Sequence, residues 1–171
     1  MRPSPRERAE GATPLLLDTT VLSNFVKVGR LPLLRQVFPT ALRIAGQVYD
    51  ELKAGSLDSP ILEGVAGAWL HLVTPDSERE MSIYREYSRT LGSGEAASLA
   101  IGICRSWALA TDDRAARQAA RTAGVPLTGS VGILIAAVHA KIIPRAEGDA
   151  LLRDMRRHGY HFPLDTLDGL L

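Results

Sequence analysis

The chain has 171 residues, of which 46% are hydrophobic, 23% charged and 5% aromatic, and its formal net charge is +1. This length suits one domain, and the scarcity of aromatic residues means that its core is built from aliphatic side chains. The near-neutral total excludes a strongly basic protein, so any basic residues that contact nucleic acid must be clustered locally.

The first residues contain no segment typical of export or membrane insertion. Residues 1–13 are polar and proline-rich without the apolar stretch of a secretory signal, so we expect a disordered tail followed by one domain over residues 14–171. No run approaches the roughly 18 apolar residues of a membrane span, which favours a cytoplasmic protein. Cys104 is the single cysteine and lies in an apolar stretch, where we expect a small buried side chain rather than a reactive thiol.

Along the chain, short apolar runs alternate with longer segments of helical periodicity. Strands are predicted at residues 15–18, 41–46, 69–73, 107–111 and 125–128. Helices are predicted at residues 20–29, 31–38, 47–55, 59–67, 76–92, 94–106, 112–124, 129–143 and within 147–163. Strands separated by helices indicate parallel β-α-β units, and therefore an α/β three-layer sandwich with a central parallel sheet.

Carboxylates and hydroxyls follow four of the five predicted strands. They are Asp18 and Thr20, Glu51, Asp112 and Asp113, and Thr128 and Ser130; a further acid, Glu95, opens a buried helix. Taken singly, such residues are explained as helix caps or as acids in a first helical turn. Ligands of open parallel sheets, however, bind beyond the carboxyl ends of the strands, where these acids would converge.

Converging carboxylates repel one another unless a cation or protons neutralise them. Oxygen ligands without histidine or cysteine suit a hard ion such as Mg²⁺ or Mn²⁺. The chain has no glycine-rich loop of the kind that cradles nucleoside triphosphates. Hydrolysis of a phosphodiester by metal-activated water is the chemistry that these residues favour.

Five segments in order resemble a PIN domain, namely LLLDTTVLSN, VYDEL, GEAASLAI, ATDDRAAR and TGSVGIL. The resemblance runs from Leu15 to Ile143, and the pair DDRAAR and GVPLTGSVGILIAA is similar to the branch near the VapC-type toxins. This resemblance extends to the segment GYHF near the C-terminus, whose pattern GY-F is typical of that branch. It implies a Mg²⁺- or Mn²⁺-dependent ribonuclease, commonly the toxin half of a toxin–antitoxin pair and usually a homodimer.

The resemblance also implies roles for single residues. Asp18, Glu95 and Asp113 match the catalytic metal carboxylates, and Glu51 matches an accessory acid. Thr20 matches a hydroxyl that orients the water on the metal. Asp112 is then a helper or a cap. The family's fourth acid is not evident, and Thr128 or Ser130 lies nearest to its position. The resemblance therefore leaves open whether one or two metal ions bind.

Basic residues follow Asp113 along one helical stripe, at Arg114, Arg117 and Arg121. They would either hold RNA phosphates or form a solvated face with local ion pairs. Three other functions are less well matched by the residues. A phosphoacceptor receiver domain lacks its acidic pair and its lysine, a haloacid-dehalogenase-type phosphatase lacks its D-x-D, and a catalytically silent PIN-like scaffold that binds RNA or protein would normally have lost its acids.

Overall fold

The three leucines that precede Asp18 form the central strand of a parallel sheet. The computed structural model describes residues 13–55 and 58–171, so nearly all of the tail predicted at residues 1–13 lies outside the described residues. The strands are β1 (Leu15–Leu17), β2 (Leu42–Ala45), β3 (His71–Val73), β4 (Ala108–Ala110) and β5 (Leu127–Thr128). They pair in parallel throughout, in the order β3-β2-β1-β4-β5. The predicted α/β class and parallel sheet are confirmed.

Helices form at each of the predicted positions and connect the strands. They are α2 (Thr19–Lys27), α3 (Leu31–Val37), α4 (Gly46–Ala54), α5 (Asp58–Ala66), α6 (Glu78–Tyr87), α7 (Ser93–Arg105), α8 (Arg114–Thr122), α9 (Ser130–His139) and α10 (Arg145–Arg157). None of these helices is long and apolar enough to cross a membrane.

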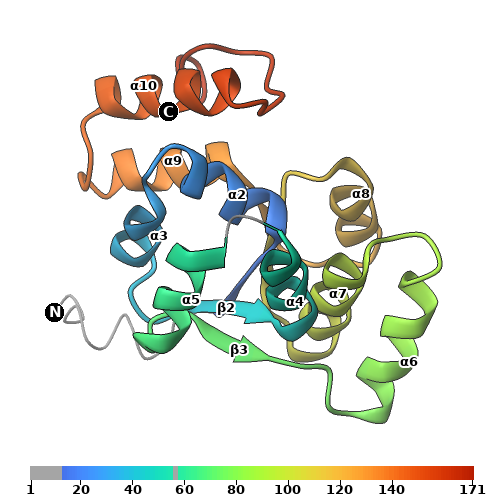
Figure 1. The fold of residues 1–171 in the computed structure, drawn as a ribbon. Coiled ribbons are helices and arrows are strands. Elements are labelled where there is room, and N and C mark those ends of the chain that lie inside the picture. The colour runs from blue at the N-terminus through green and yellow to red at the C-terminus, as the bar shows by residue number, and fades with distance from the viewer. Residues whose placement is uncertain (1–12, 56–57) are drawn as a thin grey trace, which may run out of the picture.

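The helices group into two packed sets around the sheet (Figure 1). Contacts join α2, α3, α9 and α10 in one set, and α4, α6, α7 and α8 in the other. The amphipathic helix α6 packs against α7, so it forms an outer layer and does not cover the sheet directly. The arrangement is the three-layer sandwich that the alternation of strands and helices predicts.

The core is aliphatic, as the composition requires. Strand β1 contributes an unbroken row of buried leucines, Leu15 to Leu17. The largest fully buried side chain among the described residues is the aromatic Phe25, and the other large ones are leucine and isoleucine. Cys104 is half-buried, in contrast to the buried side chain that we predicted. It lies in the last turn of α7, where neighbouring residues are also only partly covered.

The strand order reverses between β1 and β4, and this reversal positions the acids. From β1 the chain first adds β2 and β3 on one side and later returns to add β4 and β5 on the other. The connections that leave β1 and β4 therefore diverge and open a crevice at the carboxyl end of the sheet. Asp18 follows β1 directly, and Thr111 follows β4 directly.

Candidate active site

Asp18 is a buried carboxylate at this reversal of the strand order. Its backbone N–H donates to the carbonyl of Ala110 at 3.0 Å, which continues the pairing of β1 with β4. Its side chain is only 1% exposed, and Oδ2 accepts hydrogen bonds from the hydroxyls of Thr111 at 2.8 Å and Thr20 at 2.9 Å. Oδ1 has no hydrogen-bond partner among the described residues, and the side chain makes no capping bond to α2. The side chain of Asp18 is thus not used as a helix cap.

The environment of Asp18 is costly for a negative charge. Burial raises the pKa of Asp18 above its usual range, and the hydroxyls of Thr111 and Thr20, together with the backbone N–H groups of Thr19 and Thr20, oppose that rise. A buried carboxylate oxygen without a donor costs free energy unless a proton or a cation reaches it. This site is therefore prepared for a positively charged ligand.

Glu95 lies in the first turn of α7 and senses the other acids. Burial raises its pKa, a hydrogen bond from Gly92 opposes the rise, and the negative charges of Asp18, Asp113 and Glu51 raise it further. The bond from the Gly92 N–H to Glu95 Oε2 measures 3.0 Å. The structure thus brings together four of the acids that the sequence singles out.

Glu51 of α4 joins α7 through its carboxylate. Oε1 accepts from the Gly94 N–H at 2.7 Å, and Oε2 accepts from the Thr19 hydroxyl at 3.0 Å. A Cβ atom on Gly94 would lie 2.8 Å and 3.0 Å from the two carboxylate oxygens and 2.7 Å from a methyl group of Val48. Glycine at this position permits the close approach of α4 and α7 that places Glu51 beside Glu95.

The two consecutive aspartates after β4 have different surroundings. Asp113 caps α8, since its Oδ1 accepts from the Ala116 N–H at 2.8 Å, while its Oδ2 makes no hydrogen bond within the described residues. Each carboxylate oxygen of Asp112 accepts two hydrogen bonds. The donors belong to Ser130, Asn24 and Tyr160. Asp113 thus keeps an oxygen for a further ligand and Asp112 does not.

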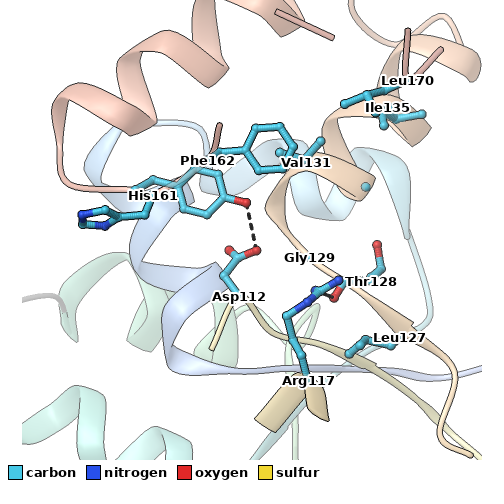
Figure 2. Close-up of a pocket in the computed structure, with 12 residues that line it drawn as sticks. Asp112, Arg117, Leu127, Thr128, Gly129, Val131, Ile135, His161, Phe162 and Leu170 are labelled. Carbon is cyan, nitrogen blue, oxygen red and sulfur yellow. Dashed lines mark hydrogen bonds between the residues drawn. The ribbon is translucent and has the colours of Figure 1, made fainter. Parts of the chain in front are cut away.

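Asp112 connects three distant parts of the chain. The Ser130 hydroxyl donates to Oδ2 at 2.5 Å and the Ser130 N–H donates to Oδ1 at 3.0 Å. The Asn24 amide donates to Oδ2 at 3.0 Å, and the Tyr160 hydroxyl donates to Oδ1 at 3.2 Å (Figure 2). Burial and the neighbouring charge of Asp112 raise the pKa of Tyr160, so this phenol stays protonated and acts as a donor. Asp112 has the contacts of a helper residue.

The two hydroxyl residues near the position of the fourth acid also differ. Ser130 is fully buried and bonded to Asp112 and Asn24. Thr128 lies at the end of β5, and its carbonyl accepts from Arg117 at 2.9 Å. The structure therefore joins Ser130 to the acids through Asp112 but places the Thr128 side chain on the wall of a neighbouring cavity.

The predicted arginine stripe separates into three environments. Arg114 is exposed and lines a groove of about 320 Å³ together with Thr20, Asp112 and Asp113. Arg117 is half-buried and donates to the carbonyls of Thr111 and Thr128. Arg121 is exposed and lines neither this groove nor the cavity beside it. The three side chains therefore have different surroundings, although they lie on one helix.

Sequence reasoning missed several residues that the fold brings to the site. Lys27, Tyr160 and His161 line the same groove as Arg114. Asn24 is a buried amide on an otherwise apolar helical face, which is a signal that the sequence does contain. The return of the C-terminal segment over α9 joins residues that are far apart in sequence, and only the tail motif hinted at it.

The residues fit a divalent cation in their chemistry. The fit depends on the oxygen-only donors, on the unpartnered Oδ1 of Asp18 and on the shared negative charge around Glu95. Within residues 13–55 and 58–171, no three His, Cys, Asp or Glu side chains are grouped closely enough to hold a metal ion as they stand. Glu95 and Asp113 each use only one carboxylate oxygen on a backbone N–H, so a joint ligand set requires the side chains to move closer together but not the loss of these bonds.

A family model described as a PIN domain matches residues 14–171. No curated protein matches the chain.

Proposed function

The chain belongs to the PIN-domain family, and from this premise we propose that it is a metal-dependent endoribonuclease that hydrolyses RNA phosphodiester bonds. The fold is a nuclease fold, and a nucleic acid is the substrate class that it suggests. The observation that carries the proposal is Asp18, a fully buried carboxylate at the reversal of the strand order with one oxygen left without a donor.

In this proposal the residues have separate tasks. Asp18, Glu95 and Asp113 would hold Mg²⁺ or Mn²⁺, which when bound lowers the pKa of an attacking water and neutralises developing charge. Thr20 and Thr111 fix the orientation of the Asp18 carboxylate by donating to its Oδ2. Glu51 contributes negative charge beside Glu95 and holds the N-terminus of α7 in position.

The groove beside the acids offers cations for the RNA backbone. Lys27 on α2 and Arg114 on α8 line it together with Thr20 and Asp113. Two cationic side chains from different helices in one groove suit a phosphate chain, and such contacts give binding a strong salt dependence. Arg117, by contrast, has its Nη1 bound to two carbonyls and serves chiefly to position the ends of β4 and β5.

The resemblance of DDRAAR and TGSVGIL to the VapC-type branch supports a narrower role. We infer from it that the protein is the toxin of a type II toxin–antitoxin pair, that a cognate antitoxin protein restrains it, and that it acts as a homodimer. The alternative to a nuclease is a catalytically silent scaffold that binds RNA or protein. An RNA cleavage assay with Asp18→Asn distinguishes the nuclease from the scaffold.

The test uses purified protein and a mixed RNA pool, with Mn²⁺ or Mg²⁺ and with EDTA, beside Asp18→Asn. We expect cleavage that requires the metal and disappears in the variant, while the variant keeps its fold because the substitution removes a charge that burial already disfavours. Melting temperatures with and without Mn²⁺ provide a second readout. If the folded wild-type protein shows no cleavage and no metal-dependent stabilisation, the scaffold is favoured instead.

A further inference from the structure

A second cavity lies beside the acidic site, under the C-terminal segment. Its volume is about 410 Å³, and Figure 2 shows residues from four parts of the chain facing it. The residues that matter for its chemistry are Asp112, Arg117, Thr128, Ile135, Tyr160 and Phe162. No task in the proposed cleavage reaction uses this space.

The cavity adjoins the site, because three residues line both spaces. Asp112, Tyr160 and His161 line both this cavity and the groove that contains Lys27 and Arg114. The hydrogen bond from the Tyr160 hydroxyl to Asp112 lies where the two spaces meet. An RNA strand whose phosphates lie in the groove would therefore place the base of a neighbouring nucleotide in the cavity.

One side of the cavity is apolar and partly aromatic. The rings of Tyr160 and Phe162 are nearly parallel, with an interplanar angle of 11° and centroids 6.0 Å apart. Their separation leaves no room for a third ring between them, so a planar ligand would stack on an outer face. Ile135 of α9 and Leu170 extend the apolar side (Figure 2).

The other side of the cavity is polar. Arg117 uses Nη1 on two carbonyl oxygens, and its Nη2 and Nε have no hydrogen-bond partner within the described residues. Arg117 and Thr128 both line the cavity, so side chains that can donate hydrogen bonds border it on this side. The negative charge of Asp112 beside them disfavours a phosphate here and suits a neutral ring with carbonyl acceptors.

We propose that this cavity takes one unpaired nucleobase of the RNA, next to the bond that is cut, and so sets the base preference of cleavage. The inference rests on the proposed function. Single-stranded RNA is recognised by bases that stack on aromatic side chains and donate or accept through their edges. A volume of about 410 Å³ lies within the range of small-ligand sites and suits one nucleoside.

The experiment has two independent readouts. In the first, the cut ends from an RNA pool are sequenced for the wild type, Phe162→Leu and Ile135→Trp. The leucine removes the stacking face and the tryptophan fills the cavity, so both should weaken the base preference at one position beside the cut by about tenfold. The matched control is Tyr87→Leu, a half-buried aromatic residue on α6 outside both spaces, which should change nothing.

In the second readout, nuclear magnetic resonance measures saturation transfer from the protein to free nucleoside monophosphates of the four bases, with no metal and no cleavage. We expect transfer to the base protons in the wild type and in Tyr87→Leu, and its loss in Phe162→Leu and Ile135→Trp. If the wild type cuts RNA but these variants keep its base preference, the inference is wrong and the nuclease remains. If no RNA is cut but the nucleotides bind in the cavity, the proposed function is wrong and the nucleobase site is supported. If RNA is not cut and nucleotides do not bind, both the proposed function and the nucleobase site are wrong.

Discussion

The hydroxyl of Thr111 donates a hydrogen bond of 2.8 Å to Oδ2 of Asp18, and so the end of β4 holds the acid that follows β1. Thr111 is fully buried, and its hydroxyl also accepts from the Asp113 N–H at 3.1 Å. One side chain therefore holds the carboxylate of Asp18 and the backbone of Asp113, and so positions two of the three proposed metal ligands. A hydroxyl suits this place because it donates and accepts at once.

The first prediction concerns Thr111→Val, which keeps the shape and removes the hydroxyl. Loss of a donor to a buried carboxylate should lower the free energy of unfolding by about 1.5–3 kcal/mol and raise the pKa of Asp18 further. If ionised Asp18 is needed for cleavage, the acidic limb of the pH–rate profile moves to higher pH. Thr111→Ser keeps the hydroxyl and should restore both properties, and an unshifted limb in the valine variant would contradict the role given to Thr111.

Local patterns predicted the sheet well, and the reason is physical. An apolar run that ends at a carboxylate requires a buried strand followed by a turn to solvent, and parallel strands bring such ends together. Asp18 could be placed from this rule, whereas Glu51 and Glu95 lie inside the first turns or body of the helices α4 and α7. The rule does not show which oxygens are already occupied, so the unequal surroundings of Asp112 and Asp113 emerge only from the structure.

Long-range packing accounts for what the sequence did not predict. Tyr160 meets Asp112 because the chain after α10 returns over α9, and no periodicity encodes that return. Helical spacing placed Arg114, Arg117 and Arg121 on one stripe, but it could not show that Arg117 turns inward to two carbonyls. For α6 the helical periodicity predicted the helix without identifying α7 as its partner.

The second prediction separates the two aspartates after β4. Asp113→Asn should abolish cleavage with little loss of stability, because asparagine is also a good helix cap. Asp112→Asn replaces an acceptor of four bonds with an amide that donates, so it should cost about 1–3 kcal/mol in the free energy of unfolding. Cleavage and urea unfolding of both variants provide the measurement. A folded, inactive Asp112→Asn beside an active Asp113→Asn would transfer the metal-ligand role to Asp112.

The third prediction tests the close approach at Gly94. In an ordinary helix Gly→Ala stabilises by about 0.4–1 kcal/mol, but here the new methyl group would meet Val48 and both Glu51 oxygens at 3.0 Å or less. We expect Gly94→Ala to lower the free energy of unfolding by about 1–3 kcal/mol and to reduce cleavage through displacement of Glu51. Combined with Glu51→Ala, the cost should be less than the sum of the two single changes. Additive costs would show that the contact is relaxed without strain.

The last prediction concerns an ion pair remote from the proposed site. Arg105 of α7 donates to both oxygens of buried Glu80 on α6, at 2.7 Å and 3.0 Å, and lies 5.2 Å from the ring centroid of Trp107. The hydrogen bond from Arg105 is the largest cause that lowers the pKa of Glu80, to about 2. Glu80 also caps α6 by accepting from the Ser77 N–H, a bond that glutamine can replace.

A carboxyl whose pKa is lowered by folding stabilises the folded state above its unfolded pKa, and this stabilisation is lost as the pH falls through the folded pKa. For Glu80 the window runs from 4.5 down to about 2. Glu80→Gln should therefore be less stable than the wild type by about 1.5–3 kcal/mol at neutral pH, with a difference that shrinks across this window. The raised pKa values of Asp18 and Glu95 act in the opposite direction, but they are common to both proteins and cancel in the difference. Urea unfolding at several pH values measures the difference, and one that stayed constant from neutral pH to pH 2 would show that the charge of Glu80 contributes nothing to α6–α7 packing.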